Sequence, residues 1–189
     1  MMSFLKNIDV QLFFWINHHH ALWLDVFFWY VSNKYVWIPF YLLIFCFFIK
    51  VYKKSAWIYI LTAVLLIIFT DQLSVHLFKN VFQRLRPCHD ETIRTFVHLY
   101  KGNCGGMYGF ISSHATNASA LAMFVWLLLR NKFSYKRWLG IFFLSYVFLI
   151  GYSRIYLGQH YPSDVVVGIL VGIFSAWFFY RILIAFQKS

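Results

Sequence analysis

Long apolar segments alternate with short polar ones along most of the chain. A helix needs about 20 apolar residues to cross the hydrocarbon core of a membrane. The clearest candidates for such helices cover residues 56–78, 112–129, 138–152 and 164–186. We expect the third of these to continue past Arg154. Residues 35–49 alone would form a helix only about 22 Å long, so we expect that helix to start near Trp23 and to kink at Pro39.

The N-terminal stretch has a different pattern, with apolar residues on one helical face. This face carries Leu5, Ile8, Leu12, Trp15 and Ile16. The pattern predicts an amphipathic helix at the membrane interface over residues 1–20, and a sixth span built from residues 5–31 is the alternative. The chain as a whole predicts an all-α, polytopic membrane helical bundle. We expect five to six transmembrane helices plus the N-terminal amphipathic helix, in one domain over residues 1–189 with a motif-bearing core over residues 55–187.

Composition supports this interpretation. Hydrophobic residues make up 61% of the chain and charged residues 12%, whereas soluble domains average about 25% charged residues. The net charge of +11 could suggest a nucleic-acid partner. However, the cations stand at the ends of apolar segments, where anionic lipid headgroups and membrane orientation explain them better. We therefore expect a lipid bilayer as partner and no nucleic acid.

The positions of Lys and Arg also predict an orientation. Two clusters, in residues 50–54 and 130–137, should face the cytoplasm by the positive-inside rule. The loop over residues 79–111 and the turn around His160 then lie together on the opposite face. This predicts a multi-pass protein of the bacterial inner (cytoplasmic) membrane, with these loops facing the periplasm or outside. Cys88 and Cys104 share that outer loop, where an oxidising compartment favours a disulfide between them; two free thiols are the alternative.

Three polar groups at segment ends carry the candidate chemistry. They are Lys79 with Arg86-Pro87, then Ser112-Ser113-His114, then Ser153-Arg154 with His160 and Asp164. Pro162 favours the first turn of a helix, so Asp164 falls in that turn, four residues after His160. Its carboxylate can hold one imidazole nitrogen of His160 and leave the other free to attack phosphorus.

The other polar residues complete a phosphate site. Ser112 and Ser113 are typical of a helix N-cap, and the helix N-terminus that they open attracts phosphate. His114 in that turn can act as a general acid and base. Three cations, Lys79, Arg86 and Arg154, can bind the equatorial oxygens of a phosphoryl group. With these groups we expect neither a metal ion nor a cofactor.

These motifs resemble those of the type 2 phosphatidic acid phosphatase superfamily, which also includes vanadium haloperoxidases. Lys79, Arg86 and Pro87 match K-x6-R-P, and the third group matches S-R-x5-H-x3-D in full. In the P-S-G-H motif, Ile111 stands for the proline and Ser113 for the glycine. The resemblance implies an α-helical core, with His160 as nucleophile and His114 as acid/base. It also implies a phosphate pocket formed by Lys79, Arg86, Arg154 and the Ser112-Ser113 segment.

Several further residues have predicted supporting roles. Asp71, an acid inside a span, either supports Arg154 or joins helices of the bundle. Ser153 is a second candidate for a supporting contact. The tract His18-His19-His20 resembles a metal-binding tract, but we expect it at the membrane interface. Gly168 and Gly172 form a small-residue stripe that favours close helix packing.

We therefore expect an integral membrane phosphatase that hydrolyses a lipid phosphate or pyrophosphate through a phosphohistidine. Undecaprenyl pyrophosphate is the first expected substrate, followed by phosphatidylglycerophosphate, phosphatidic acid and lipid A 1-phosphate. The alternatives are a vanadate-dependent oxidase and a non-catalytic lipid-phosphate binding or transport protein. The oligomeric state stays open.

Overall fold

The computed structural model describes residues 2–187, with side chains from residue 4 onward. The helices are α1 Met2–Asn17, α2 Leu22–Ser32, α3 Ile38–Tyr52, α4 Ala56–Gln72, α5 Asn80–Phe82, α6 Ser113–Leu129, α7 Lys136–Tyr156 and α8 Pro162–Phe186. Short 3-10 turns are η1 Lys34–Trp37, η2 Lys53–Ser55, η4 Arg94–Phe96 and η5 Tyr100–Gly102, and η3 Leu73–Lys79 is a π-helix. Within the described residues, the only extended pairing is a single bridge between Leu85 and Tyr108. The all-α prediction is confirmed.

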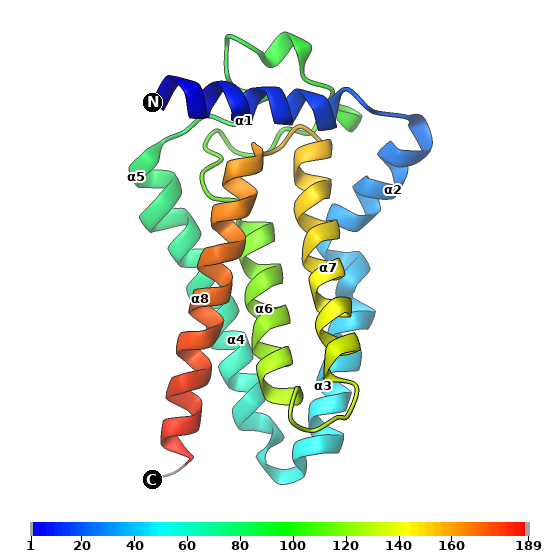
Figure 1. Cartoon of the computed structure of the whole chain (residues 1–189), viewed down its shortest axis with the longest axis vertical. Coiled ribbons are helices and arrows are strands. Elements are labelled where there is room, and N and C mark those ends of the chain that lie inside the picture. Colours follow the sequence, from blue (N-terminus) through cyan, green and yellow to red (C-terminus); the bar gives the residue numbers. More distant parts are fainter. Residues whose placement is uncertain (1, 188–189) are drawn as a thin grey trace.

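The long helices form a bundle around α6. Helices α3, α4, α6, α7 and α8 run along the long axis, and α1 lies crosswise over one end (Figure 1). Helix α6 packs against α8, α7 and α4, and eleven of its seventeen residues are buried. The loop between α5 and α6 and the turn between α7 and α8 lie at the same end as α1 (Figure 1).

The membrane spans agree with the apolar pattern. By length and composition, three stretches of the described chain can cross a membrane: Lys34–Phe82, Lys136–Tyr156 and Pro162–Phe186. The first contains both α3 and α4, and the chain reverses between them at η2 (Figure 1), where Lys53 has a φ of 49°. Helix α6 is a shorter apolar helix enclosed by the others. Helix α7 continues past Arg154 as expected.

Two predictions about the first 52 residues need correction. A single helix from Trp23 with a kink at Pro39 is wrong, because the chain leaves the helix at Asn33 (φ −82°, ψ 117°). The side chain of Asn33 accepts a hydrogen bond from the backbone N of Tyr35 (3.0 Å) and opens η1. Pro39 stands in the first turn of α3, where a missing N–H costs nothing. The alternative of one span over residues 5–31 is also wrong, since α1 and α2 are separate helices with different directions (Figure 1).

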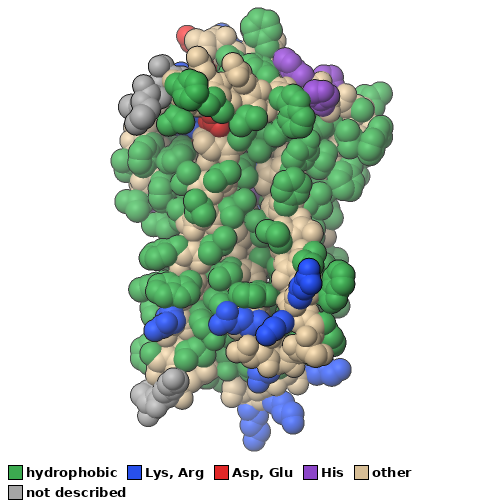
Figure 2. Space-filling model, viewed as in Figure 1, with side chains coloured by type: hydrophobic (Ala, Val, Ile, Leu, Met, Phe, Trp, Pro, Cys, Tyr) green, Lys and Arg blue, Asp and Glu red, His purple; other side chains and the backbone are tan. Residues whose placement is uncertain are grey.

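Charge divides the two ends of the bundle. In Figure 2 the Lys and Arg side chains gather at the end opposite α1, below a broad hydrophobic belt. This end is formed by η2 and by the turn between α6 and α7. Helix α1 buries Asp9 and Phe13 against the bundle and exposes apolar residues such as Leu5 and Trp15 on its outer side.

Helices α6 and α8 make the closest contact in the bundle. A Cβ on Gly168 would lie 2.9 Å from the carbonyl oxygen of Ser112, and one on Gly172 would lie 2.3 Å from that of Thr116. Only glycine allows this approach. The contact sets the distance between the N-terminal ends of α6 and α8, where the polar motifs lie.

Candidate active site

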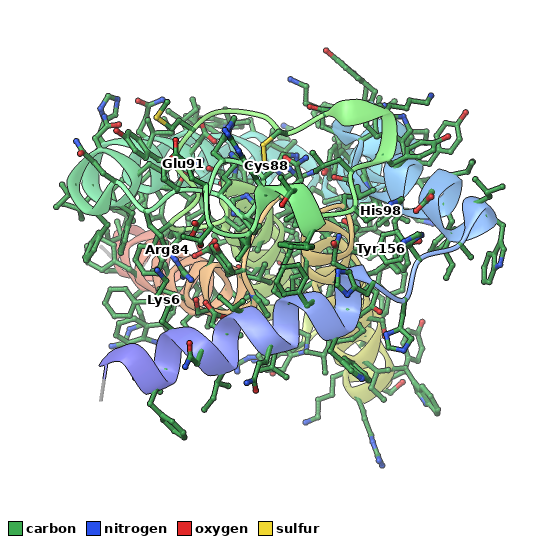
Figure 3. The ribbon with its side chains drawn as sticks, turned by 90° about the horizontal axis from the view of Figure 1, so that it is seen from above. Lys6, Arg84, Cys88, Glu91, His98 and Tyr156 are labelled. Atoms are coloured by element: carbon green, nitrogen blue, oxygen red, sulfur yellow. A yellow bond between two sulfur atoms is a disulfide. The ribbon has the colours of Figure 1, made fainter. Side chains whose placement is uncertain are left out.

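The predicted site residues gather at the end of the bundle that α1 crosses. Lys79 comes from η3, Arg86 from the loop after α5, Ser112–His114 from the start of α6, Arg154 from the end of α7, His160 from the following turn and Asp164 from the first turn of α8. Figure 3 views this end from above, with α1 along one side and the loop that carries Arg84 and Cys88 over the helix ends. A π-helix such as η3 often marks a functional site.

His160 is almost fully buried and lies between a cation and a carboxylate. Its Nε2 is 3.3 Å from Nη1 of Arg86, and its Nδ1 is 3.5 Å from Oδ2 of Asp164. Since a guanidinium only donates, we assign the proton to Nδ1 and the lone pair to Nε2. The second distance is long for a hydrogen bond, as is common in substrate-free sites. Burial, followed by the charges of Arg86, Arg154 and Lys79, lowers the pKa of His160 well below its usual value and keeps it neutral.

Asp164 is held from two sides. Its Oδ2 accepts a hydrogen bond from the backbone N of Tyr161 (3.0 Å), which begins α8. Its Oδ1 accepts one from Nη1 of Arg84 (2.8 Å). The side chain has no exposed surface. These contacts fix the carboxylate so that Oδ2 faces the imidazole of His160.

Gln159 holds two of the predicted phosphate-binding cations. Its Oε1 accepts hydrogen bonds from Nη1 of Arg86 (3.2 Å) and Nη2 of Arg154 (3.4 Å). Its amide nitrogen donates to the carbonyl oxygen of Asn103, and Arg154 also donates to Ser32. Gln159 was not predicted, because nothing in the local sequence shows that its amide lies between two arginines.

Several donors of this cluster have no internal partner. Among the described residues, Nε of Arg86, Nε of Arg154 and Oγ of Ser112 are buried and make no hydrogen bond. Buried polar atoms are normally paired. A phosphate is an anion with several strong acceptors, so it would satisfy these groups.

The Ser112-Ser113 pair departs from the cap that the sequence predicts. Ser112 stands at the N-cap of α6, but its hydroxyl makes no capping bond; instead its backbone N donates to the carbonyl oxygen of Asp164 (3.1 Å). Ser113 Oγ accepts a hydrogen bond from Nζ of Lys79 (2.6 Å) and contacts Oγ of Ser74 (2.7 Å). The serine at the glycine position of the motif thus holds Lys79.

His114 opens onto an apolar cavity of about 650 Å³. The cavity is lined by residues of α2, α3, α4, α6 and α7, including Phe48, Ile67 and Ala118. Ser113 and Asp71 also line it. The cavity therefore joins the polar cluster to the apolar interior of the bundle.

Two predicted supporting roles are not seen. Asp71 does not support Arg154, whose partners within the described chain are Ser32 and Gln159. Asp71 Oδ1 accepts a hydrogen bond from Nδ2 of Asn117 (3.3 Å) and so joins α4 to α6, which was the alternative. Ser153 also lies outside the site, because its hydroxyl donates to the carbonyl oxygen of Ile150 one turn earlier (2.7 Å).

Two other polar clusters lie at this end of the bundle. Cys88 and Cys104 are joined by a disulfide, with Cα atoms 6.0 Å apart, so neither sulfur is a free metal ligand. The rings of His20 and His98 stack at 3.7 Å with an interplanar angle of 5°. The nitrogen lone pairs of each imidazole lie in the plane of its ring, so two stacked rings do not direct their lone pairs at one metal ion. His98 Nε2 instead contacts Oδ1 of Asp25 (2.9 Å), which links the loop to α2.

The comparison with protein families agrees with this geometry. Residues 55–188 match the family model described as PAP2 superfamily, which is more than half of the chain. The chain belongs to the PAP2 superfamily. This stretch includes every residue of the three motifs, whereas α1 and Asp9 lie before it.

Individual PAP2 relatives extend the match to nearly the whole chain. The chain is 38% identical to a lipid A 4'-phosphatase of Bacteroides thetaiotaomicron, covering 96% of this chain and 80% of the relative. It is 37% identical to a lipid A 4'-phosphatase of Porphyromonas gingivalis, covering 96% and 75%. An undecaprenyl-diphosphatase of Sulfolobus acidocaldarius is 29% identical, covering 88% and 74%.

Solved structures share the fold. A PAP2-type phosphatidylglycerolphosphate phosphatase from Bacillus subtilis superposes with a TM-score of 0.73 at 18% identity, covering 97% of this chain and 86% of that one. LpxE of Aquifex aeolicus superposes with a TM-score of 0.64 at 26% identity, covering 91% and 94%. Together with the sequence relatives, this makes the protein a membrane lipid phosphatase of the PAP2 superfamily.

Proposed function

We propose that this protein hydrolyses a phosphate monoester of lipid A, with the 4'-phosphate as the first candidate, through a phosphohistidine on His160. The observation that carries the proposal is the set of buried, unpaired donors around a neutral His160, next to an apolar cavity. The donors suit a phosphate, and the cavity suits the acyl chains of a lipid. We further propose that residues 1–189 act as one membrane-embedded domain.

In the first step, the lone pair on Nε2 of His160 attacks phosphorus. Arg86, Arg154, Lys79 and the hydroxyl of Ser112 bind the phosphoryl oxygens as charge spreads over them in the transition state. The bond between phosphorus and the ester oxygen breaks, and its electron pair stays on that oxygen. His114, protonated once the negative charge of the bound phosphate offsets the nearby cations, donates a proton to it, so the lipid leaves as an alcohol. Asp164 stabilises the proton on Nδ1 as the imidazole becomes cationic.

In the second step, water hydrolyses the phosphohistidine. His114, now neutral, takes a proton from the water, whose oxygen attacks phosphorus. The bond between phosphorus and Nε2 breaks, and its electron pair returns to His160. Inorganic phosphate leaves and the site is restored.

Two relatives above 35% identity act on the 4'-phosphate of lipid A by name, and each aligns over 96% of this chain. This favours lipid A over undecaprenyl pyrophosphate, for which the support is a relative at 29% identity. Undecaprenyl pyrophosphate also presents a terminal phosphate and an apolar chain, so it is the second candidate.

We also propose that the site faces away from the cytoplasm, in the inner membrane of a bacterium. The Lys and Arg side chains gather at the end of the bundle opposite α1 (Figure 2), and the turn between α7 and α8 that carries His160 lies at the α1 end. By the positive-inside rule that cluster is cytoplasmic. The Cys88–Cys104 disulfide beside the site suits an oxidising compartment.

A substrate panel with purified protein in detergent tests the proposal. Phosphate release would be compared for bis-phosphorylated lipid A, undecaprenyl pyrophosphate, phosphatidylglycerophosphate and phosphatidic acid, with fragmentation mass spectrometry to locate the phosphate lost from lipid A. We expect the highest kcat/KM for lipid A and loss of the 4'-phosphate. Faster turnover of another lipid, or loss of the 1-phosphate, would overturn the substrate assignment.

Variants and inhibitors test the mechanism in the same assay. His160→Ala should lower turnover at least about 100-fold, whereas His76→Ala, which removes an exposed histidine of η3, should leave turnover unchanged. Vanadate should inhibit as a mimic of the five-coordinate transition state, and EDTA should have no effect. Wild-type turnover in His160→Ala, or strong inhibition by EDTA, would contradict the mechanism.

A further inference from the structure

Arg84 lies between two carboxylates from opposite ends of the chain. Its Nη1 is 2.8 Å from Oδ1 of Asp164, and its Nη2 is 2.6 Å from Oδ2 of Asp9. Figure 3 shows Arg84 beside α1, above the start of α8. Burial acts to lower the pKa of Arg84, but Asp164 and Asp9 outweigh it and raise that pKa. The guanidinium is therefore a permanent cation between the two acids.

The position of Arg84 is fixed by further contacts. Its guanidinium carbon lies 4.1 Å from the ring centroid of Tyr161, a cation–π contact. Its Nη1 also donates to Oγ of Ser163 (2.6 Å). Its backbone carbonyl accepts a hydrogen bond from the N of Gly109 (2.8 Å), just before the motif that opens α6. These contacts hold the guanidinium of Arg84 in one position. Rotation of the Asp164 carboxylate would therefore break its hydrogen bond to Arg84.

Asp9 connects this arginine to α1. Besides binding Arg84, its Oδ1 accepts a hydrogen bond from the backbone N of Ser163 (2.9 Å), and its Oδ2 accepts one from Oγ of Ser163 (2.5 Å). An acid near exposed N–H groups stabilises a helix start, here that of α8. Phe13, one turn further along α1, is fully buried and packs against Tyr161 with ring centroids 5.6 Å apart.

From these contacts we propose that Arg84 is a positioning residue for His160 and that Asp9 makes the N-terminal helix part of the active site. Arg84 holds Oδ1 of Asp164, so Oδ2 stays opposite Nδ1 of His160. Asp9 holds the second edge of the same guanidinium. Neither Arg84 nor Asp9 belongs to the three motifs, and Asp9 lies outside the residues that match the family model. The inference rests on the proposed role of His160 as nucleophile.

The geometry predicts which kinetic constants change. A misplacement of a catalytic group by about 1 Å can lower the rate about 100-fold, and lysine cannot bridge two carboxylates as a guanidinium does. Arg84→Lys should therefore lower kcat by roughly 10- to 100-fold. KM and the inhibition constant for inorganic phosphate should change less than about twofold, because Lys79, Arg86 and Arg154 are untouched.

Asp9→Asn tests the coupling through α1. The amide oxygen can still accept from Ser163, but Arg84 loses one of its two carboxylate partners and is held by Asp164 alone, so kcat should fall about tenfold. Because Asp9 acts through Arg84, adding Asp9→Asn to Arg84→Lys should lower kcat by no more than about twofold further. Losses that multiply in the double variant would overturn the coupling.

Controls separate this inference from general damage and from the proposed function. Arg94→Ala removes an exposed cation from the same loop and should behave as wild type. The melting temperature is measured for every variant. If a variant loses kcat, binds inhibitory phosphate more weakly and also melts at a lower temperature, the substituted residue has a merely structural role. If His160→Ala is inactive while Arg84→Lys and Asp9→Asn are fully active, only this inference fails. If His160→Ala is active, the phosphohistidine mechanism itself fails.

Discussion

The contact between α6 and α8 gives the most direct link between packing and catalysis, and Gly172→Ala tests it. A Cβ on Gly172 would lie 2.1 Å from Oγ of Ser119 and 2.3 Å from the carbonyl oxygen of Thr116. The hydroxyl can rotate away, but the carbonyl belongs to the backbone of α6. To reach an ordinary contact of 3.4 Å, the two helices must separate by about 1 Å.

The size of the effect follows from this separation. Overpacking of this kind costs about 1–3 kcal/mol, which corresponds to a fall in Tm of roughly 2–12 °C for a chain of this length. Helix α6 carries His114 and α8 carries Asp164, so the same movement widens the catalytic pocket. A displacement of about 1 Å can lower the rate on the order of 100-fold.

The measurement combines a thermal melt in detergent with phosphate release. Gly106→Ala is the matched control, since its added Cβ would have no atom within 4 Å and should change neither quantity. If Gly172→Ala melts and turns over like the wild type, the helices are not held at the distance described here, and the argument from packing to the pocket is refuted.

Three further predictions use the same assays. Burial and nearby cations lower the pKa of His160, so its neutral form persists below pH 6.5. The rate of phosphoenzyme formation should therefore not fall between pH 7 and pH 6. A decline with an apparent pKa near 6.5 would contradict this. Reduction of the Cys88–Cys104 disulfide, whose cysteines are 16 residues apart, should cost about 3 kcal/mol and lower Tm, whereas a variant with both cysteines changed to alanine should not respond to the reductant. Ala118→Trp should fill the apolar cavity beside His114 and slow turnover of the lipid at least about tenfold, while turnover of a short-chain phosphate monoester stays unchanged. The control Leu170→Trp, on the exposed side of α8, should leave turnover of both substrates unchanged. Equal loss on both substrates in Ala118→Trp would argue against the cavity as the acyl-chain site.

The sequence predicted the parts of the site that depend on helix ends. Lys79, Arg86, Arg154 and His160 stand at the ends of apolar segments, and the alternation of spans brings those ends to one face. Pro162 predicts the start of a helix, which places Asp164 in its first turn, close to His160 in the turn before it. For these residues, the order of elements along the chain was enough to predict that they would meet.

The contacts that tie distant segments together could not be predicted in this way. Asp9 and Arg84 are 75 residues apart, and their pairing depends on how α1 lies across the bundle. Arg84 stands at an unspecified position of the K-x6-R-P motif, so the spacing assigns it no role. The position of Gln159 between Arg86 and Arg154 depends on side-chain directions that no spacing rule gives.

Local structure explains the predictions that were wrong. Proline at a helix start and proline in a kink look alike in sequence, so Pro39 did not show that the chain breaks at Asn33. Ser153 matches the first residue of S-R-x5-H-x3-D, but its hydroxyl donates to the carbonyl oxygen of Ile150 in its own helix. For Asp71 the sequence left two roles open, and the contact with Asn117 of the neighbouring helix is the second of them.

The central claim is that His160 carries the phosphoryl group during turnover. Rapid acid-free quenching of the protein with phosphate-labelled lipid A, followed by peptide mass spectrometry, locates the label directly. The account predicts a base-stable, acid-labile phosphate on the peptide containing His160, absent from His160→Ala. Label on another residue, or full turnover with no label on His160, would contradict it.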